Sequence, residues 1–177
     1  SIPMASGMDA MGMKALFRDK QDFIAGALAL LVSMSAAAEK QTLSTELTVN
    51  QGNETIVLNL EVAACPRERI RGLQGRTSLE DDAGMLFLID PVDKVSIWMK
   101  DTYIPLDILF VDADYRVVGL VESTTPLSLR SISSPQLVAA VVEVNAGFIR
   151  RSGIRLGHSV QYHLPEKMLE RHCDVIG

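Results

Sequence analysis

Histidine, cysteine and tryptophan are scarce in this chain, and their scarcity excludes several common kinds of site. The 177 residues include three histidines, two cysteines and one tryptophan. His158, His163 and His172 all lie near the C-terminus, so no histidine stands near Trp98 and Met99 to complete a copper site. The sequence contains no G-x-S-x-G motif and no H-E-x-x-H motif, and neither cysteine stands in a recognisable motif with a histidine. We therefore expect no cofactor and no metal.

Basic residues are also too few for a nucleic-acid-binding protein. The chain has 17 Lys and Arg against 22 Asp and Glu, which gives a formal net charge of −5. Sequence-independent binding to nucleic acid depends on clustered Lys and Arg. Two local clusters, at residues 67–76 and 150–151, are interpreted as solvated helix faces. We expect no nucleic acid among the partners.

The two cysteines, Cys65 and Cys173, leave a disulfide open as an alternative. An oxidising compartment would permit the bond. A closed loop of about 100 residues would contribute roughly 4–5 kcal/mol in the chain-entropy model. Bridging requires Cα atoms within about 7 Å, which the sequence does not determine.

The N-terminal region has the pattern of a secretory signal peptide. A basic segment at residues 14–20 precedes an apolar run at residues 23–34 (FIAGALALLVSM), and small residues follow up to Ala38. We predict an upstream extension at residues 1–12, a signal peptide at residues 13–38, cleavage after Ala38, and a periplasmic or secreted protein. The alternatives are a buried helix and an uncleaved anchor, which would be the chain's one attachment to a membrane. The 12-residue run is short for a bilayer span, which needs about 20 residues.

The remaining chain predicts a mainly β fold. Short apolar runs with frequent turn residues indicate a compact jelly-roll-like sandwich or barrel of about seven or eight short strands. Two short helices are expected, one from Pro66 to Gly72 or Gly75 and one capped by Asn145 and closed by Gly153. We predict a hairpin of residues 108–111 and 116–121, a central strand at residues 137–144 and a long loop at residues 124–135. The expected domain plan is a lead-in strand at 39–56, a β-domain at 57–164 and a tail at 165–177, in a monomer.

Several motifs in a fixed order carry a resemblance to a known family. They are RGLQGR at 71–76, GMLF at 84–87, WMKDT at 98–102, PLD at 105–107, VEVNAG at 142–147 and GHSV at 157–160. Their order and spacing resemble the bacterial and archaeal domain-of-unknown-function family 192 (DUF192), over roughly residues 57–163. The resemblance implies a compact, mainly β, jelly-roll-like domain, and it implies no reaction because the family has no established chemistry. The chain departs from the family pattern at Asp101, where asparagine is more usual, and at residues 124–135.

Trp98 and Met99 are interpreted chiefly as core residues, because Trp and Met bury large apolar areas. The alternatives are the apolar floor of a ligand pocket, with Met85 on a neighbouring strand, and a soft Cu(I) site. Neighbouring residues in a strand point to opposite faces. Trp98 and Met99 therefore cannot both face one pocket without a bulge.

Charged residues next to these apolar segments complete the candidate site. Glu143 interrupts the apolar run of residues 137–142, so we predict that it is buried on the face of Val141. We expect a cation or several hydrogen-bond donors, from Arg71, Arg76 or Lys100, to satisfy it, and a catalytic carboxylate–cation pair is the alternative. Asp107 is interpreted as a structural residue that holds backbone N–H groups, with a role in acid–base chemistry as the alternative. The candidate ligand pocket comprises Arg71, Arg76, Met85, Trp98, Lys100, Thr102, Asp107 and Glu143.

These observations support three hypotheses of function. The first is an exported envelope protein whose β-domain binds a small ligand or an envelope partner. The second is a hydrolase-like or other acid–base enzyme that acts on a small polar substrate through Glu143, Asp107 and Lys100. The third is a structural or chaperone-like envelope protein.

Overall fold

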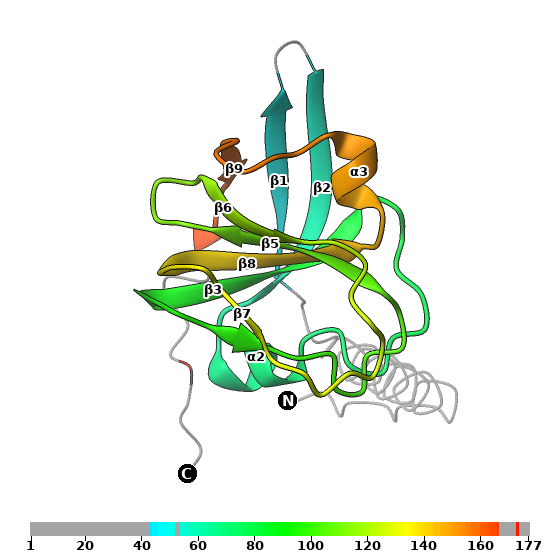
Figure 1. Ribbon diagram of the computed structural model, residues 1–177. Coiled ribbons are helices and arrows are strands. Elements are labelled where there is room, and N and C mark those ends of the chain that lie inside the picture. Colours follow the sequence, from blue (N-terminus) through cyan, green and yellow to red (C-terminus); the bar gives the residue numbers. More distant parts are fainter. Residues whose placement is uncertain (1–42, 52–53, 167–172, 174–177) are drawn as a thin grey trace, which may run out of the picture. The chain divides into compact units, whose positions relative to one another are not determined.

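The computed structural model describes residues 43–51, 54–166 and 173, and within them it contains nine strands and two short helices (Figure 1). The predicted upstream extension and signal peptide lie outside the described residues. The elements are β1 (Ser44–Gln51), β2 (Glu54–Ala63), α2 (Pro66–Arg71), β3 (Ala83–Asp93), β4 (Ser96–Ile97), β5 (Leu106–Val111), β6 (Val117–Val121), β7 (Ile132–Ser133), β8 (Val138–Asn145), α3 (Phe148–Ser152) and β9 (Val160–Tyr162). The mainly β prediction is confirmed. The strand total exceeds the expected number because β4 and β7 are only two residues long.

Seven strands form one sheet in the order β6-β5-β8-β3-β2-β1-β9, and β4 pairs with β7 in a separate ribbon. All neighbouring pairs are antiparallel except β2 and β3, whose connection contains α2. The sheet curls so that its two edges meet, because Arg116 and Ser159 form a bridge. Val117 N donates to His158 O at 2.9 Å, and Val160 N donates to Tyr115 O at 2.9 Å. The GHSV motif therefore closes a barrel-like sheet.

The sheet is covered on both faces. One apolar cluster includes Leu60, Leu86, Leu109 and Val142 from neighbouring strands of the sheet. The other cluster lies on the opposite face and includes Phe87, Ile108, Phe110, Val141 and Met99, with side chains from the β4 and β7 segments packed on it. A strand buried on both faces requires apolar residues in succession rather than in alternation.

The central position predicted for the strand at residues 137–144 is confirmed, because β8 lies between β5 and β3. Val142 and Val144 belong to the first apolar cluster and Val141 to the second. Glu143 follows this alternation and lies on the face of Val141, as predicted.

Helix α2 begins and ends as the sequence predicts. Pro66 occupies the first turn, and Glu68 Oε2 accepts hydrogen bonds from the backbone N–H groups of Ala64 and Cys65, both at 3.1 Å. Gly72 ends the helix with a φ of +47°. This φ is positive, a conformation that glycine adopts without a Cβ clash.

The predicted start of the second helix is wrong. Asn145 is the last residue of β8, and its Nδ2 donates to the carbonyl oxygens of Leu79 and Glu80, both at 2.9 Å. The side chain is thus used to hold a neighbouring loop and not to cap a helix. Helix α3 begins at Phe148 and is closed by Gly153 as expected.

Cys65 and Cys173 form a disulfide, the pairing that the sequence left open. Their Cα atoms are 5.4 Å apart, and the bond joins residues 108 positions apart in the sequence. Because Cys65 is the N-cap of α2, the disulfide fixes a C-terminal residue beside the start of that helix. No helix among the described residues has the length and apolar character needed to cross a membrane.

Candidate functional site

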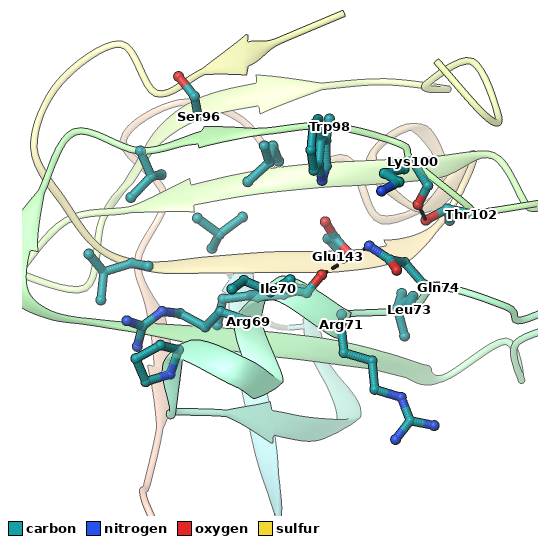
Figure 2. A pocket seen from close by; sticks show the side chains of 17 residues that line it. Arg69, Ile70, Arg71, Leu73, Gln74, Ser96, Trp98, Lys100, Thr102 and Glu143 are labelled. Atoms are coloured by element: carbon teal, nitrogen blue, oxygen red, sulfur yellow. Dashed lines mark hydrogen bonds between the residues drawn. The ribbon is translucent and has the colours of Figure 1, made fainter. Parts of the chain in front are cut away.

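A cavity of about 390 Å³ opens on the sheet face that carries Val141 and Phe87. Helix α2 and the turn after it form one wall, and residues 95–102 form the opposite wall. Strands β3 and β8 form the floor (Figure 2). We call this cavity the α2 pocket. Its size lies within the range of small-molecule binding sites, about 300–1,000 Å³.

Two of the sequence motifs meet at the end of this pocket. Gly75 of the RGLQGR motif donates its N–H to the carbonyl oxygen of Asp101 in the WMKDT motif at 2.8 Å. Leu73 is buried beneath the same turn. Asp101 has a φ of +54°, a left-handed conformation that asparagine and aspartate tolerate better than most residues. The RGLQGR and WMKDT motifs thus form the two walls of one cavity.

Gly84 of the GMLF motif sets the distance between the two floor strands. A Cβ atom at this position would lie 2.4 Å from the backbone oxygen of Glu143 and 2.7 Å from a side-chain carbon of Leu60. No other residue type fits without displacing the backbone. Gly84 therefore positions the strand that carries Glu143.

Trp98 and Met99 point to opposite sides of their segment, as the alternation predicts. Met99 is 2 % exposed and packs in the second apolar cluster, whereas Trp98 is 51 % exposed and lines the α2 pocket. The core interpretation of Trp98 is therefore wrong. Only one side of the segment at residues 96–99 packs against the sheet. The Met99 side chain lies on that side and fills the core, and the Trp98 side chain lies on the other side at the surface. Lys100 Nζ lies 5.5 Å from the centroid of the Trp98 ring, within the range of a cation–π contact.

Glu143 is 7 % exposed and its carboxyl opens into the α2 pocket. The predicted burial is confirmed, but the predicted cation partner is absent. Among the described residues, the side chain of Glu143 has no ion pair and no hydrogen bond. Arg76 instead pairs with Glu61, and Figure 2 shows the guanidinium of Arg71 directed away from Glu143. Burial raises the pKa of Glu143 from 4.5 to about 8, so the carboxyl is mostly protonated at neutral pH.

Three further polar side chains line the same end of the pocket as Glu143: those of Gln74, Lys100 and Thr102 (Figure 2). Gln74 Nε2 donates to the carbonyl oxygen of Ile70 at 2.9 Å, which leaves its Oε1 free to accept. Thr102 Oγ1 donates to the carbonyl oxygen of Lys100 at 3.2 Å. The Lys100 ammonium has no carboxylate partner among the described residues.

The structure separates three of the predicted site residues from this pocket. Asp107 is fully buried on the opposite face of the sheet, where its Oδ1 accepts from Ser123 N and its Oδ2 from Ile149 N, both at 2.8 Å. Its structural interpretation is confirmed. Met85 packs beside Glu143 across the β3–β8 pair but does not line the cavity, and Arg76 is held by Glu61. The predicted residues that do line it are Arg71, Trp98, Lys100, Thr102 and Glu143.

Sequence reasoning missed most of the apolar lining and three polar residues, Arg69, Gln74 and Ser96. The pocket also includes Ile70, Leu73, Gln74, Phe87 and Val141. All but Ile70 and Val141 stand within the RGLQGR and GMLF motifs. Val141 could have been found from Glu143, because alternate residues of a strand share a face. Within the described parts of the chain, no group of three or more His, Cys, Asp or Glu side chains is placed to hold a metal ion.

Comparisons with known proteins agree with the fold and leave the chemistry open. The family model DUF192, described as "Uncharacterized ACR", matches residues 47–162. A crystal structure of a proposed transcription regulator from Sinorhizobium meliloti 1021 is 34 % identical with a TM-score of 0.65, covering 68 % of this chain and 95 % of that chain. A protein of unknown function from Novosphingobium aromaticivorans DSM 12444 is 36 % identical with a TM-score of 0.64, covering 66 % of this chain and 83 % of that one. No match was found among curated proteins. The barrel-like sheet, the two motif walls and the matched residues together show that the chain belongs to the DUF192 family.

Proposed function

We propose that the protein is exported and that its β-domain binds a small ligand in the α2 pocket. The observation that carries the binding proposal is Glu143, a carboxyl group 7 % exposed that opens into a cavity without a partner among the described residues. Leaving a buried polar group unpaired costs about 1–3 kcal/mol. A fold keeps such a group more readily where a ligand satisfies it.

Trp98 supports the same proposal. A half-exposed tryptophan beside an apolar cavity offers a large flat surface, and aromatic side chains dominate many binding sites. The ring is not needed to fill the core, since Met99 does so. Contact with a ligand would explain why the Trp98 ring lies at the surface.

Ligand binding is favoured over the acid–base hypothesis because Glu143, Asp107 and Lys100 do not lie together in one site. Asp107 lies on the opposite face with both carboxylate oxygens occupied by backbone N–H groups. Only Glu143 and Lys100 remain in the pocket. We do not propose transcription regulation, the role in the name of the Sinorhizobium protein, because a net charge of −5 disfavours nucleic-acid binding.

Export is supported by the pattern of residues 13–38 and by the Cys65–Cys173 disulfide, which is typical of oxidising compartments. Expression in a bacterial host, followed by intact-mass measurement of the periplasmic or secreted species, tests this part. We expect a chain that begins at Glu39. A mass that retains residues 13–38 would indicate an uncleaved anchor instead.

Ligand binding is tested by a thermal-shift screen of small molecules, followed by fluorescence titration of the hits. Trp98 is the one tryptophan of the chain, so its fluorescence reports on the pocket alone. We expect a hit that raises Tm and changes Trp98 emission, and whose Tm shift is lost in Trp98→Leu but kept in Tyr103→Leu. Tyr103 is a suitable control because it is equally exposed and lies outside the pocket. Hits that stabilise Trp98→Leu as much as wild type would bind elsewhere and contradict the proposal.

A further inference from the structure

The charged residues that line the α2 pocket are predominantly basic. Arg69, Arg71 and Lys100 line it, whereas Glu143 is its one acidic lining residue. Arg69 is anchored, since its Nη1 donates to the carbonyl oxygens of Ala64 and Leu88. Lys100 and Arg71 have no acidic partner among the described residues. The lining of the pocket is therefore opposite in sign to the net charge of the protein, which is −5.

The polar end of the pocket is rich in hydrogen-bond donors. The Lys100 ammonium carries three N–H groups, and a protonated Glu143 carries one O–H group. Gln74 keeps a second amide N–H after its bond to Ile70. Figure 2 shows these three side chains on the same side of the cavity. Such a set complements a group that only accepts hydrogen bonds.

Most of the remaining lining of the pocket is apolar. It includes Phe87, Ile89, Val95, Ile97 and Val141, with Arg69 and Ser96 as its polar members. The half-exposed Trp98 ring stands in the wall beside Lys100. A ligand that fills the cavity therefore needs an apolar body, and a flat one can stack on the indole. The head group and the body must be short, because the cavity is only about 390 Å³.

We propose that the α2 pocket selects a small monocarboxylate with a flat apolar body, whose carboxylate is held at the polar end by Lys100 and Gln74, beside Glu143. The inference rests on the proposed binding function and names the ligand class. Phenylacetate is a suitable small probe of that class. Its ring would lie against Trp98, and its carboxylate would face the polar end.

A cationic ligand fits the same residues less well. It would satisfy an ionised Glu143, but it would bring positive charge next to Lys100, with Arg69 and Arg71 on the opposite wall. A carboxylate ligand instead pairs with Lys100 and accepts a hydrogen bond from Glu143, so that neither of these two groups is left without a partner. The two hypotheses differ in the sign of their pH dependence.

The pH dependence follows from the groups around Glu143. Its cross-strand neighbours on β3 and β5 are Met85 and Ile108, which do not titrate, and Glu61 beyond Met85 is paired with Arg76. The charged residues that line the cavity with Glu143 are Arg69 and Arg71 from the α2 wall and Lys100 from the opposite wall. A carboxylate ligand therefore binds best while Glu143 holds its proton. Its affinity falls above a pH of about 8, by up to tenfold per pH unit.

The test compares phenylacetate, phenylacetamide and phenethylammonium, which share one ring and differ in charge. Titration of Trp98 fluorescence and of amide resonances at about pH 6 and about pH 9 gives six dissociation constants. We expect phenylacetate to bind tightest at the lower pH and to weaken about tenfold at the higher one. Lys100→Met should weaken phenylacetate at least tenfold and leave phenylacetamide nearly unchanged. Lys94→Met is the matched control, because Lys94 is exposed and outside the pocket.

Glu143→Gln sharpens the comparison, because an amide donates as the protonated acid does but does not titrate. This variant should keep phenylacetate binding and lose its pH dependence. Tighter binding of phenethylammonium that rises with pH and disappears in Glu143→Gln would overturn the carboxylate assignment and leave the binding function in place. Equal affinity for all three probes would overturn it in the same way. No response to any probe, together with no Trp98-dependent hit in the wider screen, would overturn both proposals.

Discussion

Asp107 and Glu143 lie on neighbouring strands and are offset by one residue in register, so their side chains face opposite sides of the sheet. Asp107 pairs across the strands with Val144, and Ile108 pairs with Glu143. Both carboxyl groups are buried. Asp107 accepts two backbone N–H bonds, whereas Glu143 has no partner among the described residues. One carboxyl therefore holds the scaffold, and the other is available to a ligand.

Replacing Asp107 with Asn should destabilise the fold. The amide keeps one acceptor oxygen and turns an NH₂ group towards a backbone N–H of Ser123 or Ile149. A buried donor facing a donor costs about 1–3 kcal/mol, which a urea titration resolves. Asp114→Asn is the control, because Asp114 is exposed in the β5–β6 turn. A loss for Asp107→Asn no larger than that of the control would contradict the structural role.

Trp98→Ala and Met99→Ala should differ strongly in stability although the two residues are neighbours. Met99 is 2 % exposed, and truncating a core methionine costs about 2–5 kcal/mol. Trp98 is 51 % exposed, so its truncation should cost less than about 1 kcal/mol. Chemical denaturation of both variants measures the difference. Equal losses of stability in the two variants would indicate that Trp98 packs in the core, and would contradict its assignment to the pocket.

The strands were predictable because their patterns are local. The run of residues 137–142 identifies a strand buried on both faces, and Asp112 marks the β5–β6 turn, where its Oδ1 accepts from the N–H groups of Asp114 and Arg116. Pro66 and Gly72 set the ends of α2 through their own backbone preferences. Each of these features depends on residues close in sequence.

The pocket was less predictable because its geometry depends on distances between segments. Alternation places Glu143 on the face of Val141, but it does not say whether a cation reaches that point. Arg76 was a reasonable partner, and it is held by Glu61 instead. Asn145 has the composition of a helix cap, yet the loop at Leu79 and Glu80 takes its side chain. In both cases the side chain contacts a residue distant in sequence, which the local pattern does not indicate.

Breaking the Cys65–Cys173 disulfide should destabilise the protein. The bond closes a loop between residues 108 positions apart, for which chain entropy gives roughly 4–5 kcal/mol. A reductant should lower the urea midpoint of wild type. A Cys65→Ser/Cys173→Ser variant should have the lower midpoint already, and the reductant should not change it. A wild-type midpoint unchanged by complete reduction would show that the cross-link contributes no stability.

Glu143 should make the stability of the fold depend on pH. Burial raises the pKa of Glu143 to about 8 in the folded protein, against an ordinary value of 4.5. Below about pH 4.5 both states hold the proton, so the stabilising effect of the raised pKa is fully present. As the pH rises towards 8, the unfolded chain ionises while the folded one does not, and the free energy of unfolding falls by up to about 1.4 kcal/mol per pH unit. Above about 8 the folded carboxyl ionises as well, and the fall ends.

Urea titrations of wild type and Glu143→Gln across this pH range isolate the effect, because the other titrating groups are common to both. We expect the stability of Glu143→Gln relative to wild type to rise steadily between about pH 4.5 and 8. Glu122→Gln is the matched control, since Glu122 is exposed and pairs with Arg150 at 3.7 Å, so its curve should run parallel to that of wild type. A Glu143→Gln curve that also runs parallel would mean that Glu143 is ionised at neutral pH in the folded protein. The carboxyl would then need a cationic partner, which would remove the basis for a carboxylate ligand in the α2 pocket.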